Sequence, residues 1–149
     1  MVVLNILKDR MDITVKNLQS SISVPISKIQ LVAQQAVDQL TREGVLSRSL
    51  AELSIVFVGT QRMRTLNKRY LGHDYVTDIV TFNLESSAEL IICPQVAAVN
   101  AKGYGMPVSK ELVLYVIHGL LHLAGYDDHT PSDIKRIRAK EQELMGKLA

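Results

Sequence analysis

The stretch HGLLHLAGYDDHTP, residues 118–131, joins the end of one predicted helix to the start of another. His118 and His122 are four residues apart, so on a helix they lie on one face with Cβ atoms about 5–6 Å apart. Gly125 is typical of a helix end. The pair Thr130–Pro131 is typical of a helix start, with threonine as N-cap and proline at the first helical position. The stretch therefore predicts two helices joined by a short turn, with two imidazoles on one side of the first.

Three of the four histidines in the chain fall in this stretch. Because the chain turns after Gly125, His129 can approach an ion bound by His118 and His122. Imidazole nitrogens bind zinc at about 2.0–2.1 Å, and three protein ligands leave a fourth position for water, as in catalytic zinc sites. Two unpaired imidazoles would be costly to bury on an otherwise apolar helix, which favours a metal site over two core histidines. We predict one Zn²⁺ per chain, although another divalent metal would also suit these ligands.

The residue after the first histidine separates this pattern from that of the zincin metalloproteases. Their motif, His-Glu-x-x-His, places a glutamate there as general base. Here the position is Gly119, which cannot accept a proton. The site resembles the zincins in its ligands and departs from them in its base, so the sequence disfavours an ordinary metalloprotease.

The composition is that of a single globular domain. The 149 residues are 47% hydrophobic and 21% charged, with a formal net charge of +2, and the single cysteine excludes an intramolecular disulfide. The longest uncharged apolar run, Leu112–Tyr126, is shorter than the roughly 20 residues of a membrane-spanning helix. No basic segment precedes the apolar N-terminus, so we expect no signal peptide, no membrane association and a cytoplasmic location.

Strand-like and helix-like segments predict one α+β domain, residues 1–149, with one mixed β-sheet and about four helices packed on it. One of these helices carries both histidines in the zincin-like His-x-x-x-His pattern. Strands are expected at Val2–Leu7, Ile13–Val15, Ala51–Val58, Thr77–Phe82 and Glu89–Cys93. Helices are expected between Ser27 and Gly44, over Thr60–Tyr70, from Ser109 to Leu123 and from Thr130 onward.

The block His118–Asp127, HGLLHLAGYD, resembles the signature of the YbeY family, the bacterial zinc-dependent endoribonucleases of rRNA maturation. The resemblance covers most of Ala51–Leu144, and the chain length, the order of elements and the C-terminal helix also agree. A second, less specific block matches upstream, at Leu66-Asn67, Tyr70, Gly72, Asp74 and Thr77–Phe82.

The resemblance implies a zinc-dependent endoribonuclease that cleaves single-stranded RNA. Its implied roles are maturation of the 3′ end of the small-subunit rRNA and ribosome quality control. In such a reaction a metal-activated water attacks a phosphodiester bond. The partners that the resemblance implies are ribosomal RNA, the small ribosomal subunit and its assembly factors.

The third ligand departs from the family pattern, which has five residues between the second and third histidines. Here six residues, Leu123 to Asp128, separate His122 from His129. Either the turn absorbs the extra residue and His129 binds the metal, or Asp128 does, since a carboxylate is also a zinc ligand. We favour His129 because turns tolerate single insertions and imidazole suits zinc well.

A second departure concerns positive charge. The family usually carries an arginine directly after the tyrosine that matches Tyr70, with an implied role at RNA phosphate, and this chain has Leu71 there. The nearby Arg69 is two positions away along the helix and so points in another direction. The arginine role is therefore not transferred to either residue.

The remaining candidate site residues are acidic residues of the turn and basic residues of a helix. Asp127 and Asp128 adjoin the predicted metal site and are candidates for proton transfer, although both are equally typical of a turn. Arg62 and Arg69, on the helix Thr60–Tyr70, are candidates for contacts with RNA phosphates, or else belong to a solvated helix face.

Three functions from different classes follow from these features. The first is a zinc-dependent endoribonuclease. The second is a metal-dependent hydrolase of another substrate, such as a peptide or amide, which Gly119 disfavours. The third is a ribosome-associated zinc-binding protein without nuclease activity, which Leu71 and the altered ligand spacing leave open.

Overall fold

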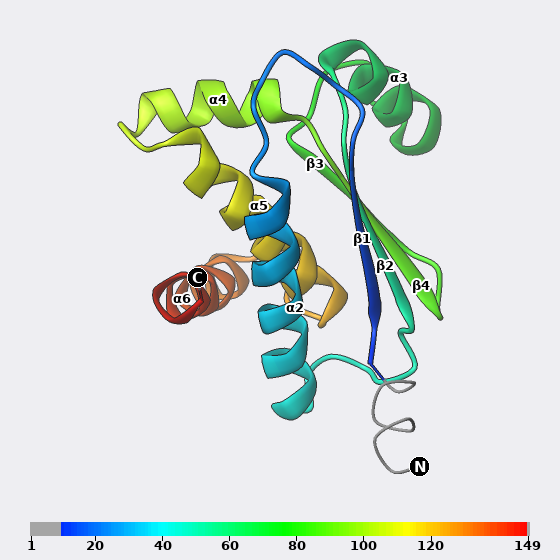
Figure 1. Ribbon diagram of the computed structural model, residues 1–149, viewed down its shortest axis with the longest axis vertical. Coiled ribbons are helices and arrows are strands. Elements are labelled where there is room, and N and C mark those ends of the chain that lie inside the picture. The colour runs from blue at the N-terminus through cyan, green and yellow to red at the C-terminus, as the bar shows by residue number, and fades with distance from the viewer. Residues whose placement is uncertain (1–9, 149) are drawn as a thin grey trace.

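The computed structural model describes residues 10–148 (Figure 1). The strand predicted at Val2–Leu7 lies outside this range. Among the described residues, no helix combines the length and the apolar character that crossing a membrane requires. In chain order the elements are β1 (Asp12–Asn17), α2 (Ile26–Arg42), β2 (Glu52–Phe57), α3 (Thr60–Leu71), β3 (Ile79–Asn83), β4 (Ser87–Ile92), α4 (Pro94–Gly103), α5 (Val108–Leu123) and α6 (Pro131–Lys147).

The four strands form one mixed sheet, as the sequence predicts, and their order in it is β1-β2-β4-β3. The strands β1, β2 and β4 are parallel, with Glu52 of β2 opposite both Asp12 and Ser87. The strand β3 runs antiparallel to β4 and pairs Ile79 with Ile92. In the part of the chain that the structure describes, β3 therefore forms one edge of the sheet, with no strand on its outer side.

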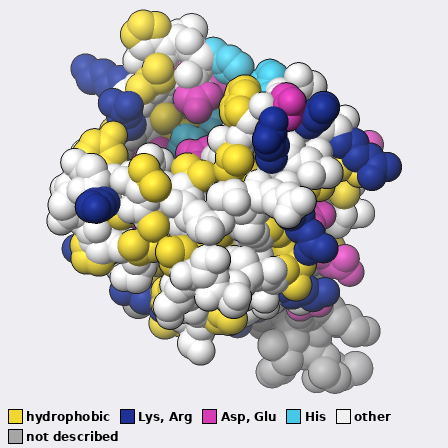
Figure 2. All heavy atoms as spheres, turned by 90° about the horizontal axis from the view of Figure 1, so that it is seen from above, with side chains coloured by type: hydrophobic (Ala, Val, Ile, Leu, Met, Phe, Trp, Pro, Cys, Tyr) yellow, Lys and Arg dark blue, Asp and Glu magenta, His cyan; other side chains and the backbone are white. Residues whose placement is uncertain are grey.

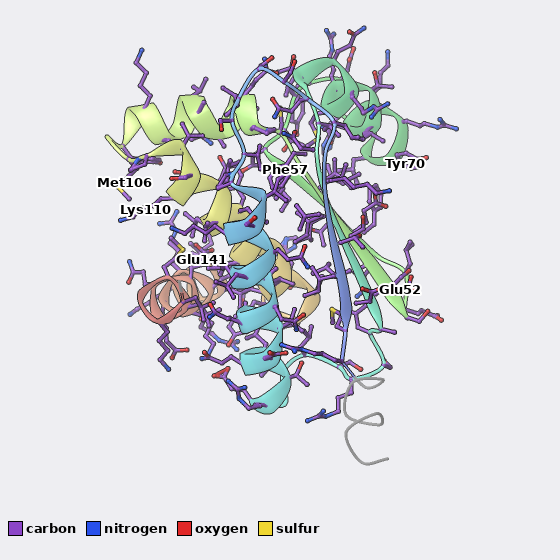
Figure 3. The ribbon with its side chains drawn as sticks, in the orientation of Figure 1. Glu52, Phe57, Tyr70, Met106, Lys110 and Glu141 are labelled. Atoms are coloured by element: carbon purple, nitrogen blue, oxygen red, sulfur yellow. The ribbon has the colours of Figure 1, made fainter. Side chains whose placement is uncertain are left out.

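The two faces of the sheet carry separate apolar cores, because successive side chains of a strand point to opposite faces. Ile55 and Phe57 of β2 belong to the larger core, which α2 and α5 cover. Val56 and Val58 belong to a smaller core on the other face, together with Met63 of α3. The helices α4 and α6 pack against α5 (Figures 1 and 3). The helix α5 therefore lies between the sheet and other helices.

The structure contains one helix, α4, that the sequence analysis does not predict, so residues 10–148 hold five helices rather than about four. It begins directly after β4, with Pro94 at its first position. Its buried residues are Pro94, Ala97 and Ala101. Because alanine and proline form this buried face, the periodic large apolar side chains that indicate an amphipathic helix are missing.

The packing of α5 on the sheet is closest at Gly119. A Cβ atom at this position would lie 2.8 Å from Leu90 Cδ2 and 3.0 Å from Ile79 Cδ1. A side chain at position 119 would therefore point at β4 and β3. A glutamate at this position would have to displace the ends of the Leu90 and Ile79 side chains, so the structure disfavours the zincin base here.

We expect Gly119→Ala to destabilise the fold, although glycine-to-alanine changes in exposed helices gain up to about 1 kcal/mol. The added methyl group would overpack a buried contact, at a cost of about 1–3 kcal/mol in the free energy of unfolding. Urea denaturation measures this. The matched control is Gly146→Ala in α6, where a Cβ atom meets nothing within 4 Å and a gain in stability is expected. Equal effects at both glycines would contradict the close approach at Gly119.

Candidate metal centre

Two histidines of α5 face each other at its C-terminal end. His118 Nε2 lies 2.9 Å from His122 Nε2, and the ring planes are nearly perpendicular, at 78°. Each side chain is 26% exposed. The helical spacing of four residues therefore brings the two ring nitrogens to a common point at the protein surface.

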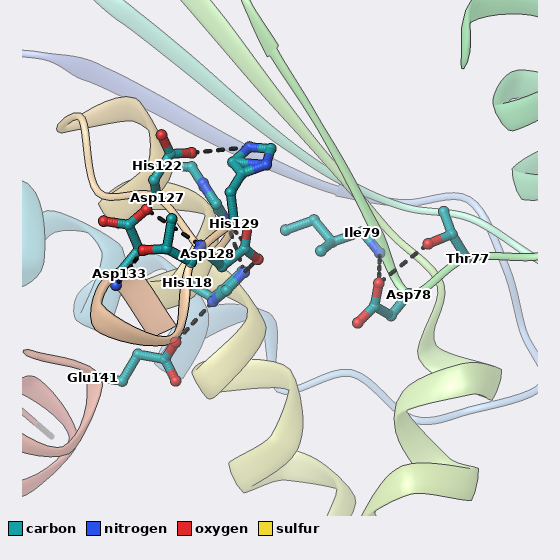
Figure 4. Close-up of polar contacts among 11 residues, drawn as sticks. Thr77, Asp78, Ile79, His118, His122, Asp127, Asp128, His129, Asp133 and Glu141 are labelled. Atoms are coloured by element: carbon teal, nitrogen blue, oxygen red, sulfur yellow. Dashed lines mark hydrogen bonds and ion pairs between the residues drawn. The ribbon is translucent and has the colours of Figure 1, made fainter. Parts of the chain in front are cut away.

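Asp128, in the turn after α5, adds a carboxylate to this pair (Figure 4). Its Oδ2 lies 3.5 Å from His122 Nε2 and 3.7 Å from His118 Nε2. Around a tetrahedral zinc with ligand distances of about 2.0–2.1 Å, ligand atoms lie about 3.3 Å apart. The separations between the three ligand atoms, 2.9, 3.5 and 3.7 Å, lie close to this value on both sides. His118, His122 and Asp128 can hold a metal ion, and their donor set is one that zinc accepts.

His129 lines the same cleft as the two helix histidines, but its ligand atoms are not grouped with theirs. Its side chain is 77% exposed, and its Nε2 is 3.2 Å from Asp127 Oδ1. Its ligand atoms lie with those of Asp127 and Asp128, in a group of three exposed residues. The structure thus brings Asp128 to His118 and His122, whereas the sequence analysis favours His129 as the third ligand. The geometry supports the other of the two alternatives.

The turn that sets these directions is fixed at both ends. Gly125 has a φ of 96°, and its N–H donates to His122 O, while the N–H of Tyr126 donates to Leu121 O. At the start of α6, Thr130 Oγ1 accepts from the N–H of Asp133, which forms the predicted cap. Asp128 and His129 both line the cleft beside this turn, and of the two it is Asp128 whose carboxylate is grouped with His118 and His122.

Glu141 of α6, which the sequence analysis does not assign to the site, contacts His118 from the side away from Asp128 (Figure 4). Its Oε1 lies 2.7 Å from His118 Nδ1. The carboxylate accepts a hydrogen bond here, so Nδ1 carries the hydrogen of that bond and Nε2 faces the site, as in carboxylate–histidine–metal arrangements. The sequence does contain a pattern that places Glu141 near the core. Glu141 lies four residues after Ile137 and three before Leu144, which are both buried, and therefore lies on the inner face of α6.

The charges around His118 are mostly negative. Burial lowers the pKa of the His118 imidazole, but the hydrogen bond to Glu141 and the negative charges of Glu141, Asp128 and Asp78 raise it more. The net pKa lies above the ordinary value. The site therefore attracts positive charge, whether a proton or a metal ion.

The cleft beside the histidines is walled by β3 and the end of α3. Its lining includes alternate residues of β3, Ile79, Thr81 and Asn83, together with Leu71. The acidic residues of the lining are Asp78 and Asp128, and none of the described lining residues is a lysine or arginine. Figure 2 shows histidine and acidic side chains together around a hollow, with Lys and Arg side chains to either side. Positive charge thus lies outside the cleft.

The basic candidates of α3 stand away from the cleft lining. Arg62 lines a separate surface depression with Gln19 and Gln95. Arg69 lies with its guanidinium 5.5 Å from the ring centre of Tyr70, at the exposed surface of α3. Neither arginine lines the cleft, and their contact with RNA remains a prediction.

A family model described as endoribonuclease YbeY matches residues 14–149. The chain belongs to the YbeY family. This confirms the predicted family and the class of enzyme, a hydrolase that acts on RNA.

Curated YbeY relatives match over much of their length. An endoribonuclease YbeY from Pelotomaculum thermopropionicum is 31% identical, with 93% of this chain and 97% of the relative covered. Another, from Chlorobium luteolum, is 36% identical and covers 68% of this chain and 77% of its own length. A solution structure from Thermotoga maritima covers 91% of this chain with a TM-score of 0.59 and 23% identity. That structure supports the fold.

We expect Glu141→Ala to weaken metal binding about 10–100-fold, the usual cost of losing a carboxylate behind a metal-binding histidine. His118 would lose the acceptor that fixes its ring and its tautomer. Competition with a chromophoric zinc chelator measures the affinity. Glu143→Ala removes a carboxylate two residues away that contacts Lys140 and is the matched control. Equal zinc affinities for the two variants would exclude a role of Glu141 in holding His118 for metal binding.

Glu111 provides a pH test of the electrostatics of α5. It is 9% exposed, and burial together with the charges of Asp78 and Glu141 raises its pKa above 4.5. A raised pKa favours folding below the unfolded pKa, and this contribution is lost as the pH rises through the folded pKa. We expect Glu111→Gln to increase the free energy of unfolding at pH 7, with the difference closing as the pH falls below about 4.5. Urea denaturation across this range would contradict the assignment if the difference were independent of pH.

Proposed function

We propose that this chain is a zinc-dependent endoribonuclease that cleaves single-stranded RNA at the centre formed by His118, His122 and Asp128. The observation that carries the proposal is the convergence of these three ligand atoms, with separations of 2.9, 3.5 and 3.7 Å, in a chain of the YbeY family. We assign the third ligand to Asp128 rather than to His129 on this geometry.

The residues around the centre would have different roles in the reaction, which are metal binding and proton transfer. When bound, zinc supplies polarisation of a phosphoryl oxygen and a water whose pKa is lowered towards about 7. His118, held by Glu141, and His122 would hold the ion together with Asp128. With Asp128 engaged in this way, the exposed Asp127 next to it would be the candidate proton acceptor. Gly119 contributes no base, because its position faces the sheet.

We further propose that the RNA is ribosomal, and that the chain acts in the cytoplasm on the 3′ end of the small-subunit rRNA and in ribosome quality control. The resemblance of the blocks at 66–82 and 118–127 to the YbeY family supports this assignment. The partners would be the small ribosomal subunit and its assembly factors. Contacts of Arg62 and Arg69 with RNA phosphates belong to the same proposal.

Cleavage of a labelled single-stranded RNA by the purified, zinc-loaded chain tests the activity. We expect cleavage that is lost with a chelator, in a His118→Ala/His122→Ala variant and in Asp128→Ala. His129→Ala is the matched control for the zinc content, since His129 is the next residue and its ligand atoms are not grouped with those of His118 and His122, and it should keep the zinc. Zinc content per chain, measured in parallel, separates loss of the ion from loss of chemistry.

The outcomes separate the candidate functions. Cleavage that persists in the double histidine variant would show a contaminating nuclease. Loss of zinc in His129→Ala but not in Asp128→Ala would restore His129 as the third ligand. A zinc-loaded protein that hydrolyses a peptide or amide but no RNA would place it in the second class of function, and one that cleaves neither free RNA nor RNA in ribosomal subunits would place it in the third.

A further inference from the structure

The cleft described above is poorly suited to hold RNA by itself. Its charged lining residues include Asp78 and Asp128, and among the described lining residues there is no lysine or arginine. A phosphate backbone carries negative charge along its whole length. Apart from the metal ion, the attraction that keeps a strand at the cleft must therefore come from its rim.

One part of that rim is the loop between α3 and β3, residues 72–78. Leu71, which precedes the loop, and Asp78, its last residue, both line the cleft. An extended chain spans at most about 3.6 Å per residue, so the Cα of His73 lies within about 7 Å of that of Leu71, and the Cα of Tyr75 within about 11 Å of that of Asp78. The loop thus adjoins the part of the cleft wall that Leu71 and Asp78 form.

The loop is held in one conformation by α3. The side chain of the buried Asn67 donates from Nδ2 to the backbone oxygen of Tyr75 at 3.0 Å. The backbone oxygen of Asn67 accepts from the N–H of His73 at 3.3 Å. Asp74 accepts from Arg64 Nε at 2.9 Å and has Lys68 Nζ at 3.8 Å. Because these contacts fix the backbone on both sides, the side chains at the tip are placed before any ligand arrives.

Two aromatic rings project at this tip. The His73 and Tyr75 rings are near-parallel, at 11°, with centres 5.2 Å apart. The Tyr75 hydroxyl lies 3.1 Å from His73 Nδ1, which locks the two rings together. Both side chains are exposed, and Tyr75 is 55% exposed. The next residue, Val76, packs into the smaller core, so Tyr75 is not needed there.

We propose that this pair, the His73–Tyr75 platform, stacks an unpaired base of the RNA next to the cleft. An aromatic face accepts any base, and stacking requires a base that is not paired in a duplex. Arg64, Lys68 and Arg69 line the neighbouring surface of α3 together with Asp74, which Arg64 and Lys68 contact. Of the three, Arg69 has no contact with Asp74 and is the candidate for an adjoining phosphate. The inference rests on the proposed function, and it explains a preference for single strands by a contact outside the metal centre.

The test is binding rather than cleavage. A fluorescein-labelled single-stranded RNA of twelve nucleotides and an abasic strand with the same backbone are titrated with the full chain, in the presence of a chelator, and followed by anisotropy. We expect the chain to bind the RNA more tightly than the abasic strand. Tyr75→Leu should weaken binding of the RNA roughly 5–100-fold, the range for loss of one aromatic stacking contact, and leave binding of the abasic strand unchanged.

Two further variants control for structure and for aromatic exposure in general. Tyr75→Phe keeps the ring and loses only the hydrogen bond to His73, so its RNA affinity should stay close to that of the unchanged chain. Tyr104→Leu removes a more exposed tyrosine, 79% exposed, at the end of α4, on the opposite side of the molecule from α3 (Figure 1). Its affinity for both strands should not change.

The platform is overturned if Tyr75→Leu binds the RNA as the unchanged chain does, if it loses affinity equally for both strands, or if the unchanged chain does not distinguish the strands. These results leave the nuclease assay untouched, since the chelator removes the metal from the binding measurement. Conversely, base-dependent binding by a chain that never cleaves RNA would overturn the proposed function and keep the platform.

Discussion

The contact between α5 and the sheet at Gly119 is the constraint on which the site depends. Because Leu90 and Ile79 occupy the space that a side chain at 119 would need, the helix approaches β4 and β3 without an intervening layer. This fixes the rotation of α5 about its axis. With Gly119 turned to the sheet, the neighbouring His118 and its partner His122 are turned to the open edge beside β3, where they face the cleft.

The same contact bears on the chemistry. In a His-Glu-x-x-His helix the residue after the first histidine is free to work as a base, but here that position is used for packing. The acidic groups near the candidate metal centre therefore come from elsewhere: Asp128 from the turn, Glu141 from α6 and Asp78 from the residue before β3. The helix carries the two candidate nitrogen ligands, and its neighbours carry the carboxylates, of which Glu141 contacts His118.

Much of this arrangement follows from the sequence, and the failures have physical causes. The four-residue spacing of His118 and His122 determines that they share a face, because helical periodicity is a local property. The choice between Asp128 and His129 depends on which way two consecutive side chains leave a turn, and spacing alone does not contain that information. Glu141 is 23 residues from its partner His118, and only the packing of α6 on α5 brings the two together.

The fold class was also predictable from local periodicity, whereas the helix α4 was not. Alternating apolar residues identify strands, and β2 and β4 carry them clearly in Leu53, Ile55, Leu90 and Ile92. The helix α4 buries small residues, Ala97 and Ala101, whose sequence pattern is weak although their packing is complete. Sequence patterns therefore identify elements with large buried side chains more readily than elements that fit into narrow spaces.

The candidate ligands lie close together along the chain, which has a consequence for how the protein folds. His118, His122, Asp128 and Glu141 all belong to one helix–turn–helix segment, whereas Asp12 of β1 pairs with Glu52, 40 positions away. Local contacts form quickly, and the pairing of distant strands is slow. We therefore expect the ligand set to form early in folding, with the α5–α6 hairpin. Its placement against the sheet also needs β4, because Gly119 packs against Leu90.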